Sequence, residues 1–155
     1  MKKKITFNDL VAMDPCYHPS EIGIFENYSA TVADFIKEYR DKVNNKEDII
    51  WVICRNDYMT DKDMRLFAVW CAREALKLVY NPDPRSVAAC DIAERYANGD
   101  ATDEDLSAAG DAAWDAAWDA AWAAAGDAAW DSAWDSAWDA AWDKQIDKLL
   151  TYFNK

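Results

Sequence analysis

The C-terminal third of the chain repeats every four residues. From Gly110 to Asp147, one position of each repeat is usually Trp, the next is almost always Asp, and the other two are almost entirely Ala. The repeat places Trp at Trp114, Trp118, Trp122, Trp130, Trp134, Trp138 and Trp142. Gly110 and Gly126 fall in the same phase, and Ile146 and Leu150 continue it with ordinary core residues. Because Ala is the best helix former, composition and spacing both predict a helix.

A period of four does not match the 3.6 residues of a helical turn. Each repeat overshoots a turn by about 40°, so the Trp line winds through about 280° between Trp114 and Trp142. An unbroken helix over 103–152 would be about 75 Å long, against a radius of gyration of about 15 Å for a compact chain of this size. We therefore expect a bend or break near Gly126, with Asp127 as the next helix cap. One continuous rod is the alternative, because the repeat keeps its phase through Gly126.

Seven indoles at about 200 Å² each are too much apolar surface to leave in water. We expect most of them to be buried against residues 30–97, with Ala allowing close helix packing and Asp forming a solvated face. The alternative is that part of the Trp stripe is an interface with a second copy or a foreign protein, since Trp is enriched at binding hot spots.

The rest of the chain carries helix signals. A Thr followed three residues later by Asp predicts helix starts at Thr6, Thr31, Thr60 and Thr102. Asp83-Pro84 predicts another start and Asn98-Gly99 a helix end. Spacing by three and four predicts a buried face made of Leu66, Phe67, Trp70, Cys71, Ala75, Leu78 and Val79. The apolar run Ile49–Cys54 is read as a buried helix rather than a strand, since no partner strand is evident. The expected fold is an all-α helical bundle forming one domain, 1–155, with a long C-terminal helix or helical hairpin.

Charge divides the chain at residue 98. Residues 1–98 hold 16 acidic and 14 basic side chains, whereas residues 99–155 hold 13 and 3, and the whole chain has a net charge of -12. This acidity argues against direct binding of nucleic acid and of anionic membranes. It favours a basic protein or a nucleic-acid-binding effector as partner. The segment after Met1 becomes polar too soon for a signal peptide, so we expect a cytoplasmic protein, in the host cytoplasm if phage-encoded.

Catalytic motifs are missing from the sequence. It has one His, no Gly-rich phosphate loop and no G-x-S-x-G, so we expect no enzyme and no cofactor. Cys16 and His18 lack two further ligands at a recognisable spacing, so no metal is expected. Cys54, Cys71 and Cys90 are interpreted as reduced core residues. Mimicry of a nucleic-acid backbone stays open, although Asp recurs about every 6 Å and duplex DNA carries a charge about every 1.7 Å.

Three ordered motifs precede the Ala/Trp tail: residues 65–76 (Arg-Leu-Phe-Ala-Val-Trp-Cys-Ala-Arg-Glu-Ala-Leu), residues 93–99 (Ala-Glu-Arg-Tyr-Ala-Asn-Gly) and residues 101–106 (Ala-Thr-Asp-Glu-Asp-Leu). Together they resemble the small immunity protein family of bacteria and their phages, over roughly residues 48–150. The tail departs from that family by carrying Trp and Asp where relatives often have Arg or Ala. The resemblance implies an all-α accessory protein that acts by binding, and it brings no catalytic or binding motif.

The sequence therefore predicts a protein-binding inhibitor, immunity-like or anti-defence, of a nuclease, toxin or CRISPR effector. The alternative is a structural protein that dimerises through the Trp stripe. The predicted partner-binding residues are Asp127, Asp131, Asp135, Asp139, Trp130, Trp134 and Trp138.

Overall fold

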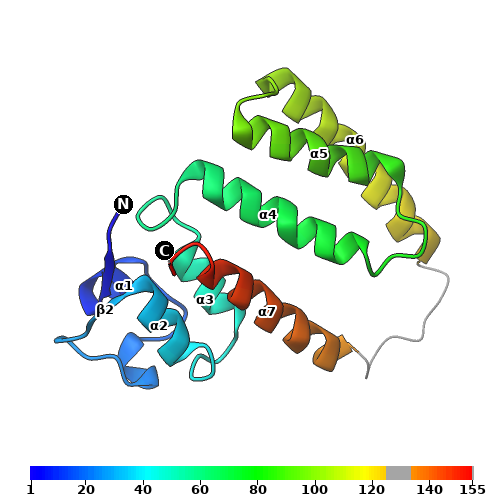
Figure 1. Ribbon diagram of the computed structural model, residues 1–155. Helices are drawn as coiled ribbons and strands as arrows, with labels where there is room; N and C mark the ends of the chain where they lie inside the picture. The colour runs from blue at the N-terminus through cyan, green and yellow to red at the C-terminus, as the bar shows by residue number, and fades with distance from the viewer. Residues whose placement is uncertain (125–133, 155) are drawn as a thin grey trace. The chain divides into compact units, whose positions relative to one another are not determined.

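The computed structural model describes residues 1–124 and 134–154, and all of their side chains except those of 117–124 and 134–139. Helices make up 62% of it, and the described residues contain one two-stranded sheet, so the all-α prediction is confirmed. The elements in order are β1 (Lys4–Thr6), α1 (Phe7–Ala12), η1 (Pro19–Ile22), β2 (Ser29–Thr31), α2 (Val32–Tyr39), α3 (Glu47–Ile53), α4 (Asp61–Leu76), α5 (Pro84–Asn98), α6 (Asp103–Ala124) and α7 (Trp134–Leu150) (Figure 1).

The chain divides into two compact units. Unit 1 comprises Met1–Thr60 with Trp134–Lys155, and unit 2 comprises Asp61–Ala133. The last helix, α7, thus belongs with the N-terminal residues, whereas α6 belongs with α4 and α5. The change in charge at residue 98 does not coincide with this division, because α5 and α6 lie in the same unit. The single domain 1–155 stays a prediction.

Unit 1 has an apolar core to which α7 contributes directly. β1 pairs antiparallel with β2, placing Ile5 opposite Ala30. α7 lies against α2 and α3 (Figure 1). The largest fully buried side chains are Phe35, Ile5, Ile24, Ile36, Ile49, Ile53, Ile146 and Leu149. Because two of them come from α7, this helix completes a core built mainly by residues 1–60.

The described residues of unit 2 form three helices, with α5 packed along both α4 and α6 (Figure 1). Among its described side chains, the buried ones are Phe67, Val69, Cys90 and Ala116. Arg73 of α4 forms ion pairs with Asp91 and Glu94 of α5, at 2.8 and 2.6 Å. Ion pairs between α4 and α5 therefore accompany the small set of buried side chains in this unit.

Helix starts follow the predicted pattern. At the start of α1, the Asp9 amide donates to Thr6 Oγ1 (3.2 Å) and the Thr6 amide donates to Asp9 Oδ2 (3.0 Å). The same reciprocal pair joins Thr102 and Asp105 before α6, at 3.1 and 2.9 Å. Each pair satisfies two backbone donors that the helix leaves without partners. These two predicted starts are confirmed.

The other boundaries also agree. Thr31 accepts a hydrogen bond from the Asp34 amide at the start of α2. α4 begins directly after Thr60. Asp83 caps α5, and Gly99 ends it with a left-handed φ of 84°. The run Ile49–Cys54 lies almost wholly in α3, as predicted, with Ile49, Val52 and Ile53 buried.

One predicted buried face is wrong toward its end. Phe67 is buried, but Ala75 is exposed, Leu78 is 85% exposed and Val79 is 53% exposed. α4 ends at Leu76, and Asn81 then adopts a left-handed φ of 59° in the following loop. The apolar spacing of three and four continues past the end of α4, so Leu78 and Val79 do not lie on the buried face of that helix. The strands were also missed, because three residues are too few to show alternation.

The predicted bend near Gly126 lies outside the described residues, as does Asp127. On either side of them the structure describes α6 and α7 as helices. Within the described residues, no helix combines the length and the apolar character that crossing a bilayer requires.

Candidate protein-binding surface

In the part of α6 whose side chains are described, the inner side consists of Leu106 and several alanines. Leu106, Ala109, Ala112 and Ala113 are half-buried, and Ala116 is 3% exposed. Spacings of three and four place these residues on one face of the helix. Because α6 packs along α5, the described alanines of this face, rather than Trp114, allow the close approach.

Trp114 lies on the opposite side of α6. Ala116 is two positions further along the chain, which corresponds to about 200° around a helix. Its side chain is 71% exposed. The expectation that the indoles are buried is therefore wrong for Trp114, since a buried Ala face and an indole two positions away point in opposite directions.

Acidic residues precede and follow Trp114 in sequence, and their side chains are exposed as well. Asp111 and Asp115 are exposed, and so are Asp103, Glu104 and Asp105 in the first turn of α6. Hydrogen bonds from the backbone and hydroxyl of Thr102 lower the pKa of Asp105, which keeps that carboxylate charged. The predicted solvated Asp face is confirmed at Asp111 and Asp115. We call Asp111, Trp114 and Asp115 the α6 surface.

The last repeats behave differently, because their carboxylates pair with cations of the same chain. Arg40, just after α2, donates to Asp143 Oδ1 (3.1 Å) and to Asp147 Oδ1 (2.7 Å). Lys46, just before α3, donates to Asp143 Oδ2 (2.7 Å). The hydrogen bonds from Lys46 and Arg40 lower the pKa of Asp143. Asp143 and Asp147 therefore attach α7 to the segment between α2 and α3, and they are not a free acidic face.

Most of the predicted partner-binding residues fall where the structure gives no side-chain description. Asp127, Trp130 and Asp131 lie outside the described residues. Trp134, Asp135, Trp138 and Asp139 lie in the backbone of α7, but their side chains are outside the described part. These seven residues stay predictions, and the α6 surface is the exposed piece of the repeat that the structure does describe.

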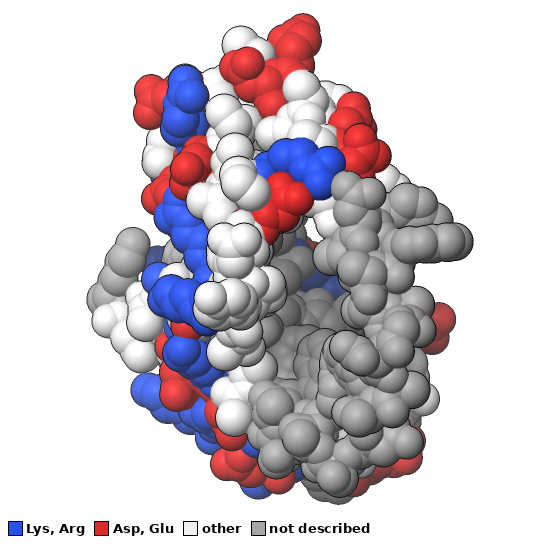
Figure 2. Space-filling view, turned by 90° about the vertical axis from the view of Figure 1, so that its right-hand side faces the viewer, with Lys and Arg blue, Asp and Glu red and all other residues white. Residues whose placement is uncertain are grey.

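Among the described residues, acidic and basic side chains are intermixed over the face drawn in Figure 2. The described acidic residues on this face therefore form separate groups rather than one continuous negatively charged surface.

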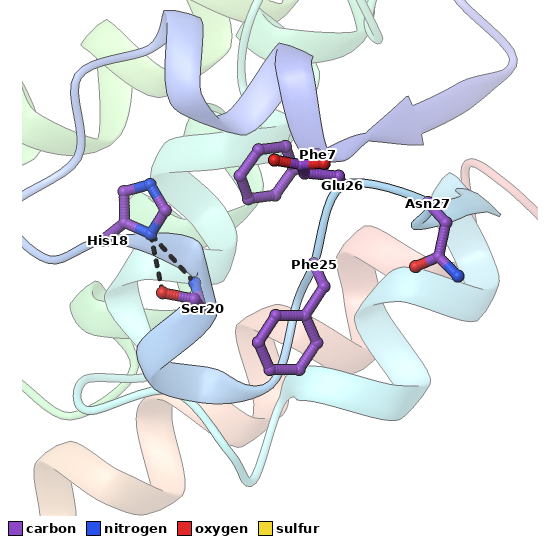
Figure 3. A pocket seen from close by; sticks show the side chains of 6 residues that line it. All are labelled: Phe7, His18, Ser20, Phe25, Glu26 and Asn27. Atoms are coloured by element: carbon purple, nitrogen blue, oxygen red, sulfur yellow. Dashed lines mark hydrogen bonds between the residues drawn. The ribbon is translucent and has the colours of Figure 1, made fainter.

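Unit 1 has an aromatic pocket of about 500 Å³ at the start of α1 and η1, lined by Phe7, His18, Ser20, Phe25, Glu26 and Asn27 (Figure 3). His18 Nδ1 accepts a hydrogen bond from the Ser20 amide (3.3 Å) and lies 2.7 Å from Ser20 Oγ. The His18 ring packs edge-on against Phe7, with ring centres 5.7 Å apart. These contacts make His18 a helix cap and an aromatic wall.

A second pocket of about 410 Å³, here called the α3 pocket, lies between α3 and the loop after α1. Its buried residues include Leu10, Pro19, Ile24, Phe35, Ile49 and Val52, and its more polar lining residues are Asp14, Cys16, Tyr17, Glu47 and Asp48. The Tyr17 hydroxyl donates to Asp48 Oδ2 (2.9 Å), and burial together with this bond raises the pKa of Tyr17 to about 12. Tyr17 therefore stays protonated near neutral pH.

The described residues contain no group of three or more His, Cys, Asp or Glu side chains placed to hold a metal ion. Cys90 is buried, Cys54 and Cys71 are half-buried, and Cys16 is exposed. Burial raises the pKa of Cys54 to about 11, so this thiol is protonated and unreactive near neutral pH.

Compared with protein-family models, curated proteins and solved structures, the chain matches none of them.

Sequence reasoning missed both pockets. The α3 pocket draws on helices and a loop that are distant in sequence, so no local spacing marks it. The one available sign was the stretch from Asp14 to Pro19, where two prolines fix a loop rich in polar and aromatic residues. Loops of this kind often line binding sites on a rigid scaffold.

Proposed function

We propose that this chain is a non-enzymatic binding protein that holds a basic protein partner through the α6 surface. One observation carries the proposal: Trp114 is 71% exposed on a helix that buries Ala116 instead, and exposed Asp111 and Asp115 flank it. An exposed indole surrounded by carboxylates suits a contact in which a buried aromatic anchor is bordered by charge.

The charge of the chain supports the partner class. The net charge of -12 attracts cationic proteins and speeds their association at low salt. Nucleases and nucleic-acid-binding effectors present basic channels, so they are the partners we propose. The resemblance to the immunity protein family supports an immunity-like or anti-defence inhibitor acting in the cytoplasm.

The test is capture of partners from a bacterial lysate on the immobilised full chain, followed by measurement of the dissociation constant for each protein identified. Asp111→Asn with Asp115→Asn should weaken binding at low salt, and Trp114→Ala should weaken it at both low and high salt. Asp41→Asn with Glu26→Gln is the matched control, because it removes two exposed charges elsewhere. Equal losses in both double variants would indicate nonspecific attraction. Full binding by all three variants would reject the α6 surface.

Self-assembly is the second candidate. The same exposed Trp114 favours it, because two copies of an indole stripe can bury one another across a symmetric interface. Sedimentation velocity at micromolar concentration distinguishes the two proposals. A dimer that Trp114→Ala dissociates would support assembly, and a monomer at every concentration would reject it.

A further inference from the structure

The α3 pocket has an apolar floor that belongs to the core of unit 1. Ile24 and Ile49 are fully buried, Phe35 is 2% exposed and Leu10 is 5% exposed. Side chains this deeply packed do not rearrange freely, so the floor is preformed. A volume of about 410 Å³ lies in the range of small-molecule pockets.

The charged groups that line the pocket all carry the same sign. Asp14, Glu47 and Asp48 line it, and none of its described lining residues is Lys or Arg. Asp14 and Glu47 are exposed, and Asp48 is half-buried. The Tyr17 hydroxyl occupies Asp48 Oδ2, which fixes the orientation of that carboxylate at the wall of the pocket. Apolar floor and acidic lining together select a ligand with an apolar body and a positive charge.

The pocket also has an aromatic wall. Trp51 is 43% exposed, and both Trp51 and Tyr17 line the pocket. Arg55 lies over the Trp51 ring, 4.1 Å from its centre, so this indole already accepts one cation on a face. Arg55 itself does not line the pocket. Aromatic faces attract organic cations as well as apolar bodies.

We propose that the α3 pocket binds a small organic cation with an aromatic or aliphatic body. The body packs on the floor formed by Ile24, Phe35 and Ile49. The ammonium group faces the carboxylates of Glu47 and Asp48, with Asp14 nearby. This site lies in unit 1 and is independent of the α6 surface, so the two proposals stand or fall separately.

The test is a titration of the full chain with tryptamine, followed by amide and indole resonances in two-dimensional NMR. Indole-3-acetate is the matched ligand, since it keeps the ring and reverses the charge. Tryptamine should shift resonances of the lining residues, including the Trp51 indole. Indole-3-acetate should bind at least about fivefold more weakly, which is the effect expected of a solvent-accessible ion pair.

Variants distinguish the contribution of the acidic residues to ligand binding from that of the pocket volume. Asp14→Asn with Glu47→Gln should weaken tryptamine by about fivefold, as for a solvent-accessible ion pair. Asn suits position 14, because Asp14 has a left-handed φ of 52° that Asn tolerates. Asp41→Asn, an exposed change outside the pocket, should leave the affinity unchanged. Val43→Phe should obstruct the pocket for both ligands, because Val43 lines it and is only half-buried.

Three results would overturn the proposal. Tryptamine could leave the lining resonances unmoved. The two ligands could bind equally, which would remove the charge preference. The lining resonances could instead shift with protein concentration in the absence of ligand, which would mean that a second copy occupies the pocket.

Discussion

Arg40 Nη1 lies 2.7 Å from Asp147 Oδ1, although 107 residues separate the two in sequence. The same guanidinium reaches Asp143 one turn earlier, so one arginine engages two successive carboxylates of the Asp repeat. Because the Arg40 side chain is 22% exposed, the pairing is partly shielded from water. The Asp residues of a repeat that looks uniform in sequence thus have different roles along its length. Asp111 and Asp115 are exposed, whereas Asp143 and Asp147 hold α7 in place through Arg40.

Replacing Asp143 with Asn should destabilise unit 1. The change removes one carboxylate from two cations, Arg40 and Lys46, each 22% exposed. We expect a loss of about 1 kcal/mol in the free energy of unfolding, because the pair is partly solvated. Urea unfolding followed by circular dichroism measures it. Asp111→Asn, the same substitution in the same phase of the repeat, should change stability by less than about 0.5 kcal/mol.

The contribution of Asp143 should depend on pH. Hydrogen bonds from Lys46 and Arg40 lower its pKa from the usual 3.8. A carboxyl group whose pKa is lower in the folded state stabilises that state above its unfolded pKa and loses this effect as pH falls through the folded pKa. The stability difference between wild type and Asp143→Asn should therefore be constant above about pH 5 and shrink below about pH 4. A difference that stayed constant down to pH 2 would show that Asp143 is not paired.

The core contribution of α7 can be tested with two adjacent leucines. Leu149 is fully buried, whereas Leu150 is only half-buried. Leu149→Ala should cost about 2–5 kcal/mol in unfolding free energy, as for other buried leucines. Leu150→Ala should cost clearly less. The repeat phase predicts the reverse order, so a larger loss at Leu150 would mean that α7 is rotated relative to the structure.

The predictable parts of this fold were those specified by neighbouring residues. Thr6 and Thr102 predict helix starts because the cap is local. The Thr hydroxyl and the carboxylate of the Asp three residues later accept hydrogen bonds from nearby backbone amides. Phe67 was predicted as core from spacing within one helix. The exposure of Leu78 and the pairing of Ile5 with Ala30 were not predictable in this way, because both depend on where the chain turns and what it then meets.

The candidate sites were harder to predict than the fold for a similar reason. The repeat contains a Trp, an Asp and two Ala, and any of the three residue types could have faced the neighbouring helix. Sequence reasoning chose Trp because large apolar side chains bury most surface. On α6 the structure instead buries Ala116 and leaves Trp114 exposed. Close packing of α6 along α5 favours small side chains on the contact face. The apolar area of the side chains therefore did not by itself determine which face of α6 packs against α5.

The orientation of α6 gives the last prediction. Ala116 is 3% exposed and Ala108 is exposed on the same helix. Ala116→Leu should lose about 1–3 kcal/mol of stability through overpacking, whereas Ala108→Leu should be nearly neutral. Trp114→Ala should also be nearly neutral, because an indole that is 71% exposed contributes little to the fold. If Trp114→Ala instead cost as much as Ala116→Leu, the indole would be part of the core, and the α6 surface could not serve as a binding face.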